Sequence, residues 1–240
     1  PGTAPKFKPS KVGLLGAGMM GAGIAYVQSS KGISTVLKDV SKEKAELGKS
    51  YSAKITQGRV DKGRMKPEDQ QKILDRIHPT GDATDLQGCD LIIEAVFENR
   101  ELKAQVTKES EPMLAPGGFF ASNTSTLPIS GLATASTQPN KFVGIHFFSP
   151  VDKMKLVEII RGKLTDDETV ARAYDYVQAI GKMPIVVNDS RGFFTSRVFG
   201  TFVMEGVAMV GEGIPAAAIE NAGMQCGMPV GPLAVLDETA

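Results

Sequence analysis

Residues 11–39 place a glycine-rich turn between two short apolar segments, and this arrangement constrains the fold more than any other part of the chain. The segment KVGLL (11–15) is typical of a buried strand, and GAGMMG (16–21) follows it directly and opens a helix. A second apolar strand over 34–37 ends at Asp39. A dinucleotide-binding βαβ unit requires this order of elements: a strand, a glycine-rich turn, a helix, a second strand and an acidic residue. The sequence therefore predicts a nucleotide site at the first strand-to-helix turn.

The small and acidic residues of this unit have separate tasks. Gly16 permits the tight turn, Gly18 lets the backbone approach a pyrophosphate, and Gly21 lets the helix pack closely on the strand. The helix N-terminus offers unpaired N–H groups and a positive dipole end to the phosphates. The Asp39 carboxylate accepts from the two ribose hydroxyls and repels a 2′-phosphate, which favours NAD over NADP. Two alternatives stay open: a glycine-rich turn that only packs, and a 2′-phosphate contact from Lys38.

The composition excludes several classes of protein. The chain has 240 residues, 42% hydrophobic and 22% charged, which is enough for one large domain or one and a half. Its 27 basic and 27 acidic side chains leave no positive surplus for binding nucleic acid. No apolar run is long enough to span a membrane. The only cysteines, Cys89 and Cys226, lack metal or disulfide spacing. This predicts a reducing compartment, either a bacterial cytoplasm or an organelle matrix.

Strand-like and helix-like patterns alternate along most of the chain. Further strands are expected at 76–80, 90–96, 119–122, 142–148, 155–160 and 184–187, and helices at 42–64, 67–74, 101–113 and 166–180. This alternation predicts an α/β fold, a Rossmann-like, doubly wound and mostly parallel sheet.

Three segments are expected along the chain. Residues 1–10 are Pro-rich and indicate a linker or an expression boundary. Residues 11–188 form the nucleotide-binding domain. Residues 189–240 begin an all-α domain with helices at 193–210 and 216–224, and the first is apolar nearly all round, as a buried helix is. A new element after Pro229 stops abruptly, so we expect the chain to be part of a longer protein.

Three of the predicted strands end in polar residues, at 94–99, 122–125 and 146–150. In sheets of this kind the ligand lies outside the carboxyl ends of the strands. We therefore expect these three segments to meet beside the glycine-rich turn. The alternative for 123–125 is a helix cap before Pro128.

His146 is the residue on which the predicted chemistry depends. An imidazole suits removal of a hydroxyl proton at neutral pH. Glu158 lies between apolar neighbours and needs a partner, and a strand, turn and strand can bring it beside His146. Ser125 could then hydrogen-bond the reacting oxygen. Alternatively, His146 is structural and Glu158 pairs at the surface with Arg161 or Lys155. The other histidine, His78, is expected to be structural.

Several motifs together resemble those of L-3-hydroxyacyl-CoA dehydrogenases. These are GAGMMGAGIA (16–25), EAVFEN (94–99), SNTS (122–125), HFFSP (146–150) and MKLVE (154–158). They agree in order and spacing, and the resemblance covers 11–240. The segments LKD (37–39), FFSPVD (147–152) and GFFTSR (192–197) look most like the dehydrogenase part of the multifunctional fatty-acid oxidation α-subunit. There an enoyl-CoA hydratase domain precedes this segment.

The resemblance implies NAD-dependent oxidation of an L-3-hydroxyacyl-CoA to a 3-oxoacyl-CoA in fatty-acid β-oxidation. It implies a catalytic role for His146, Glu158, Ser125 and Ser196. It implies an NAD site formed by Gly16, Gly18, Met20, Gly21, Asp39, Val96, Phe97, Glu98, Lys103, Asn123, Ser125 and Ser149, with no metal. Ser149 and Ser196 stand where the single-function enzymes carry Asn, so the roles of those Asn residues do not transfer directly.

The implied partners are an acyl-CoA substrate, a hydratase domain in the same parent chain, a thiolase subunit and a second copy of the chain. The family's helical C-terminal domain continues well beyond 240 and commonly forms the dimer contact. We therefore expect this piece to bind NAD but to turn over acyl-CoA poorly. Two rival functions are a related NAD-dependent β-hydroxyacid dehydrogenase and a non-catalytic NAD-binding protein on the same fold.

Overall fold

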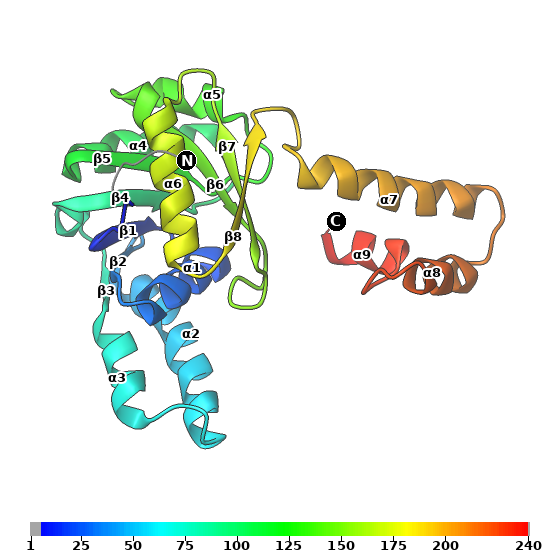
Figure 1. The fold of residues 1–240 in the computed structure, drawn as a ribbon, viewed down its shortest axis with the longest axis horizontal. Coiled ribbons are helices and arrows are strands. Elements are labelled where there is room, and N and C mark those ends of the chain that lie inside the picture. The colour runs from blue at the N-terminus through cyan, green and yellow to red at the C-terminus, as the bar shows by residue number, and fades with distance from the viewer. Residues whose placement is uncertain (1–5, 240) are drawn as a thin grey trace. The chain divides into compact units, whose positions relative to one another are not determined.

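The structure, a computed structural model, describes residues 6–239. The chain folds into two compact units, Pro1–Asp189 and Ser190–Ala240. Each unit is described by itself below (Figure 1). Half of the expected N-terminal linker, residues 1–5, lies outside the described residues.

The first unit is built on an eight-stranded sheet. Its strands are β1 (Lys11–Leu15), β2 (Ser34–Lys38), β3 (Ile77–Thr80), β4 (Cys89–Glu94), β5 (Leu114–Ser122), β6 (Phe142–Phe147), β7 (Leu156–Arg161) and β8 (Met183–Asn188). They lie in the order β3-β2-β1-β4-β5-β6-β7-β8. The first six strands are parallel, β7 is antiparallel to β6, and β8 is parallel to β7. This confirms the predicted Rossmann-like, mostly parallel sheet.

The helices of the first unit are α1 (Met19–Ser30), α2 (Lys42–Asp61), α3 (Pro67–Asp75), α4 (Arg100–Ser110), α5 (Ile129–Leu132) and α6 (Asp167–Ala179). Three of them begin at a residue whose side chain caps the helix, namely Ser41 for α2, Asn99 for α4 and Asp166 for α6. The residue at the N-cap of α1 is Gly18, so this helix has no side-chain cap.

The segment after α4 differs from the prediction. A helix was expected to continue to 113, but α4 ends at Ser110 and a 3₁₀ turn covers Glu111–Met113. Pro112 has no N–H to donate to the Lys108 carbonyl oxygen, so the α-helical hydrogen-bond pattern stops there. Strand β5 therefore begins at Leu114, earlier than the expected 119.

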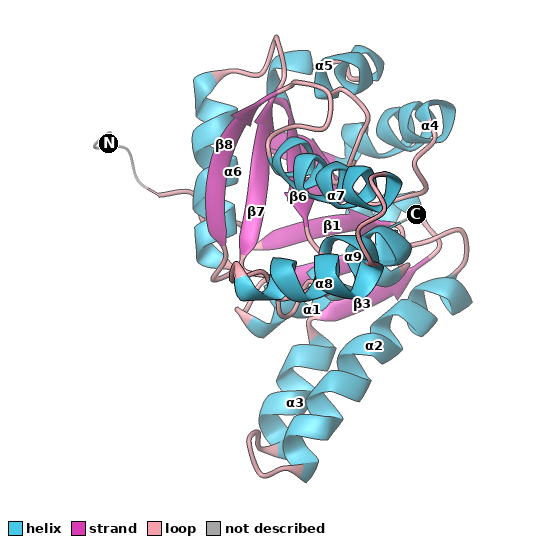
Figure 2. Ribbon diagram, turned by 90° about the vertical axis from the view of Figure 1, so that its right-hand side faces the viewer, coloured by secondary structure: helices cyan, strands magenta, loops and turns pink. Residues whose placement is uncertain are grey.

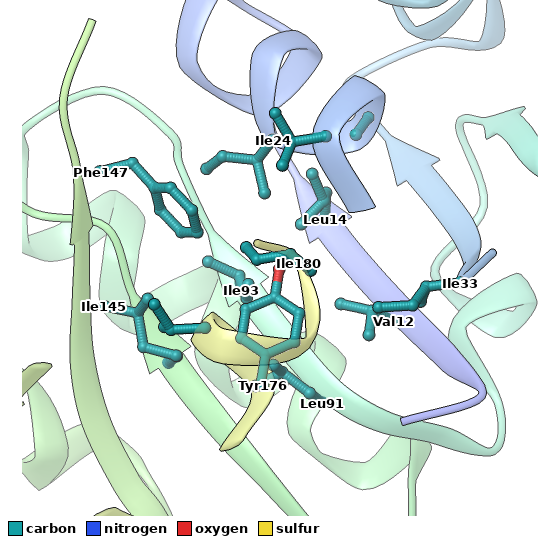
Figure 3. Packing of buried hydrophobic residues seen from close by; sticks show 14 of the residues in the cluster. Val12, Leu14, Ile24, Ile33, Leu91, Ile93, Ile145, Phe147, Tyr176 and Ile180 are labelled. Atoms are coloured by element: carbon teal, nitrogen blue, oxygen red, sulfur yellow. The ribbon is translucent and has the colours of Figure 1, made fainter. Parts of the chain in front are cut away.

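The two faces of the sheet carry different side chains. On one face, alternate residues such as Leu14 and Ile93 pack against α1 and α6 and form the hydrophobic core (Figure 3). Tyr176 of α6 is fully buried there, and its hydroxyl donates to Gln28 Oε1 at 2.7 Å. Because side chains alternate along a strand, the neighbours of these residues point to the other face. That face receives the polar ends of β4, β5, β6 and β7.

The second unit contains α7 (Thr195–Gly211), α8 (Ala216–Gln225) and α9 (Pro232–Thr239) (Figures 1 and 2). Helix α7 was expected to be buried on all sides. Within its own unit it buries Val203 and Gly206, and Gly206 lies directly against Pro232. Neither α8 nor α9 covers Val198 or Met204, because two short helices cover only one side of α7.

Candidate active site

Two glycines close the turn between β1 and α1. Gly16 has a φ of +92°, and a Cβ atom there would lie 2.7 Å from the Ala95 carbonyl oxygen. A Cβ atom on Gly21 would lie 1.8 Å from the Gly16 carbonyl oxygen. Both distances are too short for any side chain, so the turn, α1 and the end of β4 can approach this closely only with glycine at both positions.

Gly18, in contrast, faces open space. A Cβ atom there would have no neighbour within 4 Å. The first N–H groups of α1 have no side-chain cap, whereas those of α2, α4 and α6 do. An open approach to uncapped N–H groups at a helix N-terminus suits a phosphate. The turn therefore fits the pyrophosphate of a dinucleotide.

Asp39 lies directly beside this turn. Its Oδ2 accepts from the Ala17 N–H at 2.6 Å and its Oδ1 accepts from the Val40 N–H at 2.7 Å. These contacts fix the carboxylate at the end of β2, where it can still accept from ribose hydroxyls with its other lone pairs. The alternative role of Lys38 has no support in the geometry, because its ammonium lies 3.3 Å from the Glu109 carboxylate and its side chain is 13% exposed.

Three apolar residues assigned to the cofactor site border the turn. Met20 and Val96 are partly buried, whereas the Phe97 side chain is 87% exposed. An aromatic ring this exposed beside a polar site can cover a flat ligand. Their contacts with NAD remain a prediction.

Lys103 was also expected to line the cofactor site, but its side chain is only 2% exposed. Its Nζ lies 2.8 and 3.0 Å from the two carboxylate oxygens of Glu94, which is fully buried. The Ser122 hydroxyl donates to the same carboxylate. A buried ion pair thus joins α4 to the end of β4, and the Ser122 hydrogen bond adds the end of β5; the sequence did not predict this ion pair. The role of Lys103 in the NAD site stays a prediction.

Glu98 organises the turn that contains Ser125. Its Oε1 accepts from the Ser125 N–H at 3.0 Å, from the Thr126 N–H and hydroxyl at 3.1 Å each, and from the Thr124 hydroxyl. Its Oε2 lies 3.2 Å from Lys103 Nζ. Burial raises the pKa of Glu98, but the Thr124 hydrogen bond and the Lys103 charge outweigh it, so the pKa lies below its ordinary value.

The alternative of a helix cap at 123–125 is not observed, since α5 has no side-chain cap. Instead, Thr124 Oγ1 accepts from the Leu127 N–H at 2.9 Å and closes a turn. Asn123 Oδ1 accepts from the Phe147 N–H at 2.9 Å. Asn123 therefore joins the end of β5 to the end of β6, and Ser125 lies exposed on the turn beyond it.

His146 and Glu158 lie directly opposite each other on β6 and β7. His146 Nδ1 lies 2.8 Å from Glu158 Oε2, and the residues are 5% and 0% exposed. This is the contact that the sequence predicted. The surface alternative is not observed, because Arg161 pairs with Asp167 at 2.6 Å. With Nδ1–H donated to the carboxylate, Nε2 is the ring nitrogen that carries the lone pair, as a general base requires.

The two serines that replace Asn in the resemblance lie in different units. The Ser149 hydroxyl, just after β6, is 3.6 Å from the Met19 sulfur at the start of α1, which places it between His146 and the phosphate turn. Ser196 lies in α7 of the second unit. Its catalytic role remains a prediction.

Other candidate groups stand apart from this site. His78 is 63% exposed and lies 3.5 Å from Asp85. Cys89 is buried, and burial raises the pKa of its thiol to about 11. Over residues 6–239, no three His, Cys, Asp or Glu side chains are grouped in a way that could hold a metal ion. Within the same range, no helix has the length and apolar character needed to cross a membrane.

Comparison with known proteins decides the family. Residues 11–190 match the 3-hydroxyacyl-CoA dehydrogenase NAD-binding domain, and residues 192–240 match the C-terminal domain of the same enzymes. The chain belongs to the 3-hydroxyacyl-CoA dehydrogenase family. It is accordingly an NAD-dependent oxidoreductase of that class, as the sequence motifs predicted.

Solved structures of relatives agree with this assignment. The (S)-3-hydroxybutyryl-CoA dehydrogenase of Ralstonia eutropha is 34% identical with a TM-score of 0.93, over 97% of this chain and 83% of that one. The 3-hydroxybutyryl-CoA dehydrogenase of Escherichia coli is 31% identical with a TM-score of 0.93, over 97% of this chain and 50% of that one. The dehydrogenase part of a Caenorhabditis elegans multifunctional enzyme is 26% identical with a TM-score of 0.72, over 97% of this chain and 54% of that one.

Proposed function

We propose that this dehydrogenase oxidises L-3-hydroxyacyl-CoA thioesters to 3-oxoacyl-CoA thioesters in fatty-acid β-oxidation, with His146 as the general base. The observation that carries the proposal is the buried His146–Glu158 contact of 2.8 Å at the carboxyl end of β6. A buried carboxylate opposite an imidazole holds the ring in one tautomer and stabilises the imidazolium that forms when the ring takes a proton.

In the proposed reaction, His146 Nε2 removes the proton of the C3 hydroxyl, and the hydrogen on C3 leaves as hydride. Bound NAD supplies the hydride acceptor at its nicotinamide C4. Glu158 keeps Nδ1 protonated and does not itself accept the substrate proton. Ser125, whose N–H donates to Glu98, would hydrogen-bond the reacting oxygen. The products are a 3-oxoacyl-CoA, NADH and one proton.

The cofactor would bind along the edge formed by Gly16, Gly18 and Gly21. The N-terminus of α1 would hold the pyrophosphate, and Asp39 would hold the ribose. Met20, Val96 and Phe97 would border the site, and Ser149 would lie toward the nicotinamide. This assignment rests on the close glycine contacts and the open space at Gly18.

We also propose that the chain acts within a multifunctional protein, after an enoyl-CoA hydratase domain and beside a thiolase subunit. A reducing compartment and self-association belong to the same proposal. Its support is the likeness to the Caenorhabditis elegans multifunctional enzyme and the specific sequence details at 37–39, 147–152 and 192–197.

A second candidate function is a dehydrogenase for a small free acid or related carbonyl compound. It is favoured by a relative that is 28% identical over 97% of this chain and is described as an NAD⁺-dependent 5-formyl-3-hydroxy-2-methylpyridine 4-carboxylic acid 5-dehydrogenase.

The test is oxidation of NADH by acetoacetyl-CoA compared with free acetoacetate, measured in the proposed multifunctional protein, because we expect the 240-residue piece to turn over acyl-CoA poorly. We expect kcat/KM to be at least about 100-fold higher for the thioester, since remote binding energy of the CoA is used at the reacting carbon. Equal rates would favour the small-acid function. Binding of NADH without turnover of either compound would indicate a non-catalytic protein.

A further inference from the structure

The connection at 148–155 between β6 and β7 determines how His146 and Glu158 face each other. In an antiparallel pair, a change of register by one residue turns every side chain to the opposite face. A two-residue hairpin fixes register by its own turn geometry, but a connection of this length does not. Contacts from outside the hairpin can therefore add to the apolar pattern of β6 and β7 in holding His146 opposite Glu158.

Part of this connection is a single helical turn. The N–H groups of Lys153 and Met154 both donate to the Pro150 carbonyl oxygen, at 3.0 and 2.9 Å. One isolated turn leaves its later carbonyl groups without backbone partners. The carbonyl oxygens of Val151 and Met154 both accept from the ammonium of Lys182 instead.

Lys182 reaches this turn from the residue before β8. Strand β8 pairs with β7, with Met183 opposite Leu156. Burial lowers the pKa of Lys182, and the negative charge of Asp152 partly opposes this effect. The ammonium is partly buried, and the two carbonyl oxygens accept from it in place of water.

The same turn packs against α1, the helix whose N-terminus is the proposed phosphate site. Val151 is 2% exposed, and a Cβ atom on Gly23 of α1 would lie 2.9 Å from its Cβ. Ser149 lies beside Met19 at the start of α1. The Tyr51 hydroxyl of α2 donates to Asp152 Oδ1 at 3.1 Å. The connection thus touches both the catalytic hairpin and the helix whose N-terminus holds the phosphates.

We propose that Lys182 is a positioning residue for the reaction: by binding the Val151 and Met154 carbonyl groups, it holds the His146–Glu158 pair at a fixed place relative to α1. Lys182 itself touches neither substrate nor cofactor. The inference rests on the proposed role of His146 as the base. Misplacement of a base by about 1 Å costs up to about 100-fold in rate.

The experiment compares Lys182→Met with Lys153→Met. The methionine keeps the length of each side chain and removes one charge, and Lys153 is exposed on the same connection, so it is a matched control. We expect Lys182→Met to lower kcat with acetoacetyl-CoA by at least about 10-fold, with the NADH Kd changed by less than about twofold. Lys153→Met should change neither value by more than about twofold.

A second measurement does not need turnover. The chain has two histidines, so the imidazole signals of His146 can be separated from those of His78 by NMR. Lys182→Met should shift or broaden the ring signals of His146 and leave those of His78 unchanged. Lys182→Arg retains cationic donors and should restore the His146 signals and most of kcat. If Lys182→Met does not fold, Lys182→Gln, which keeps an N–H donor, is measured in the same way.

Normal kcat and unchanged His146 signals in a folded Lys182→Met or Lys182→Gln protein would overturn the proposal, even if thermal stability fell. This result differs from failure of the proposed function. In that case His146→Gln would keep full activity, whereas here His146→Gln remains inactive while the Lys182 variants are normal.

Discussion

The phosphate turn and the His146–Glu158 pair lie at the same end of the sheet but are built in different ways. The phosphate turn is made by backbone that approaches closely because Gly16 and Gly21 have no side chain. The catalytic pair is made by two polar side chains buried between strands. The phosphate turn depends on the absence of side-chain atoms at Gly16 and Gly21, whereas the catalytic pair depends on the register of β6 and β7. The two should therefore fail under different substitutions.

The largest expected effect is that of a substitution in the His146–Glu158 pair. In the proposed multifunctional parent protein, His146→Gln should lower kcat by about 10²–10⁴-fold, because the base that takes the hydroxyl proton is lost. The NADH Kd should change by less than about twofold, since the phosphate turn is untouched. Steady-state rates with acetoacetyl-CoA and fluorescence titration with NADH measure the two quantities. His78→Gln is the control and should behave as the unsubstituted protein; near-normal turnover in His146→Gln would remove His146 from the mechanism.

Glu158→Gln tests the second member of the pair. We expect a milder loss of kcat, about 10-fold, and a change in the pH dependence of kcat/KM, because the carboxylate stabilises the charged imidazole. The measurement is a pH–rate profile of both proteins. Asp85→Asn beside His78 is the matched control and should leave the profile unchanged. A Glu158→Gln profile identical to that of the unsubstituted protein would make Glu158 a structural residue.

Gly18→Ala tests the backbone site. The added Cβ meets no protein atom within 4 Å, so thermal stability should not fall, but the methyl group obstructs the phosphates. We expect NADH to bind about 10-fold more weakly, or about 1.4 kcal/mol. Gly58→Ala in α2 also meets no atom within 4 Å and is the control. It should stabilise the protein by about 0.5–1 kcal/mol without changing NADH affinity. Unchanged affinity in Gly18→Ala would place the pyrophosphate elsewhere.

Asp39→Asn tests the preference for NAD over NADP at the same site. Loss of the negative charge removes repulsion of a 2′-phosphate and weakens the hold on the ribose hydroxyls. The ratio of NADPH to NADH dissociation constants should fall by about 10-fold, mainly through weaker NADH binding. Titration of both reduced cofactors measures the ratio. A ratio that stays constant would show that Asp39 acts only on the Ala17 and Val40 N–H groups.

Glu98→Gln has the smallest expected effect and concerns the turn between the two sites. The pKa of Glu98 is lowered in the folded protein. Its carboxylate therefore stabilises the fold at pH values above the ordinary pKa of 4.5, and this contribution is lost as the pH falls further. Because the side chain is 37% exposed, solvent screening limits the loss at pH 7 to about 1 kcal/mol or less. Denaturant unfolding at pH 7 and pH 4 should show the difference shrink at the lower pH. An equal difference at both values would contradict it.

The phosphate turn and the sheet could be predicted because both depend on local sequence patterns. Glycine spacing, apolar runs and the acidic residue after β2 are short-range patterns. The His146–Glu158 contact was also predictable, since a polar residue inside an apolar strand must find a partner nearby.

Contacts between distant segments were not predictable in the same way. Nothing near Lys182 indicates that its ammonium binds carbonyl groups of the 150–154 turn. The Lys103–Glu94 ion pair was not predicted, because the resemblance assigned Lys103 to the NAD site and burial of the ion pair depends on how α4 packs on β4. The end of α4 was missed because the helix was expected to continue through Pro112 to 113, although proline has no N–H for the helical hydrogen bond.

The antiparallel direction of β7 has a consequence for folding kinetics. His146 and Glu158 lie only 12 positions apart, whereas Glu98 and Ser125 lie 27 apart. The entropy lost on closing a chain segment grows with the logarithm of its length, and contacts between near neighbours form early. Bringing His146 and Glu158 together therefore costs less chain entropy than closing the Glu98–Ser125 contact.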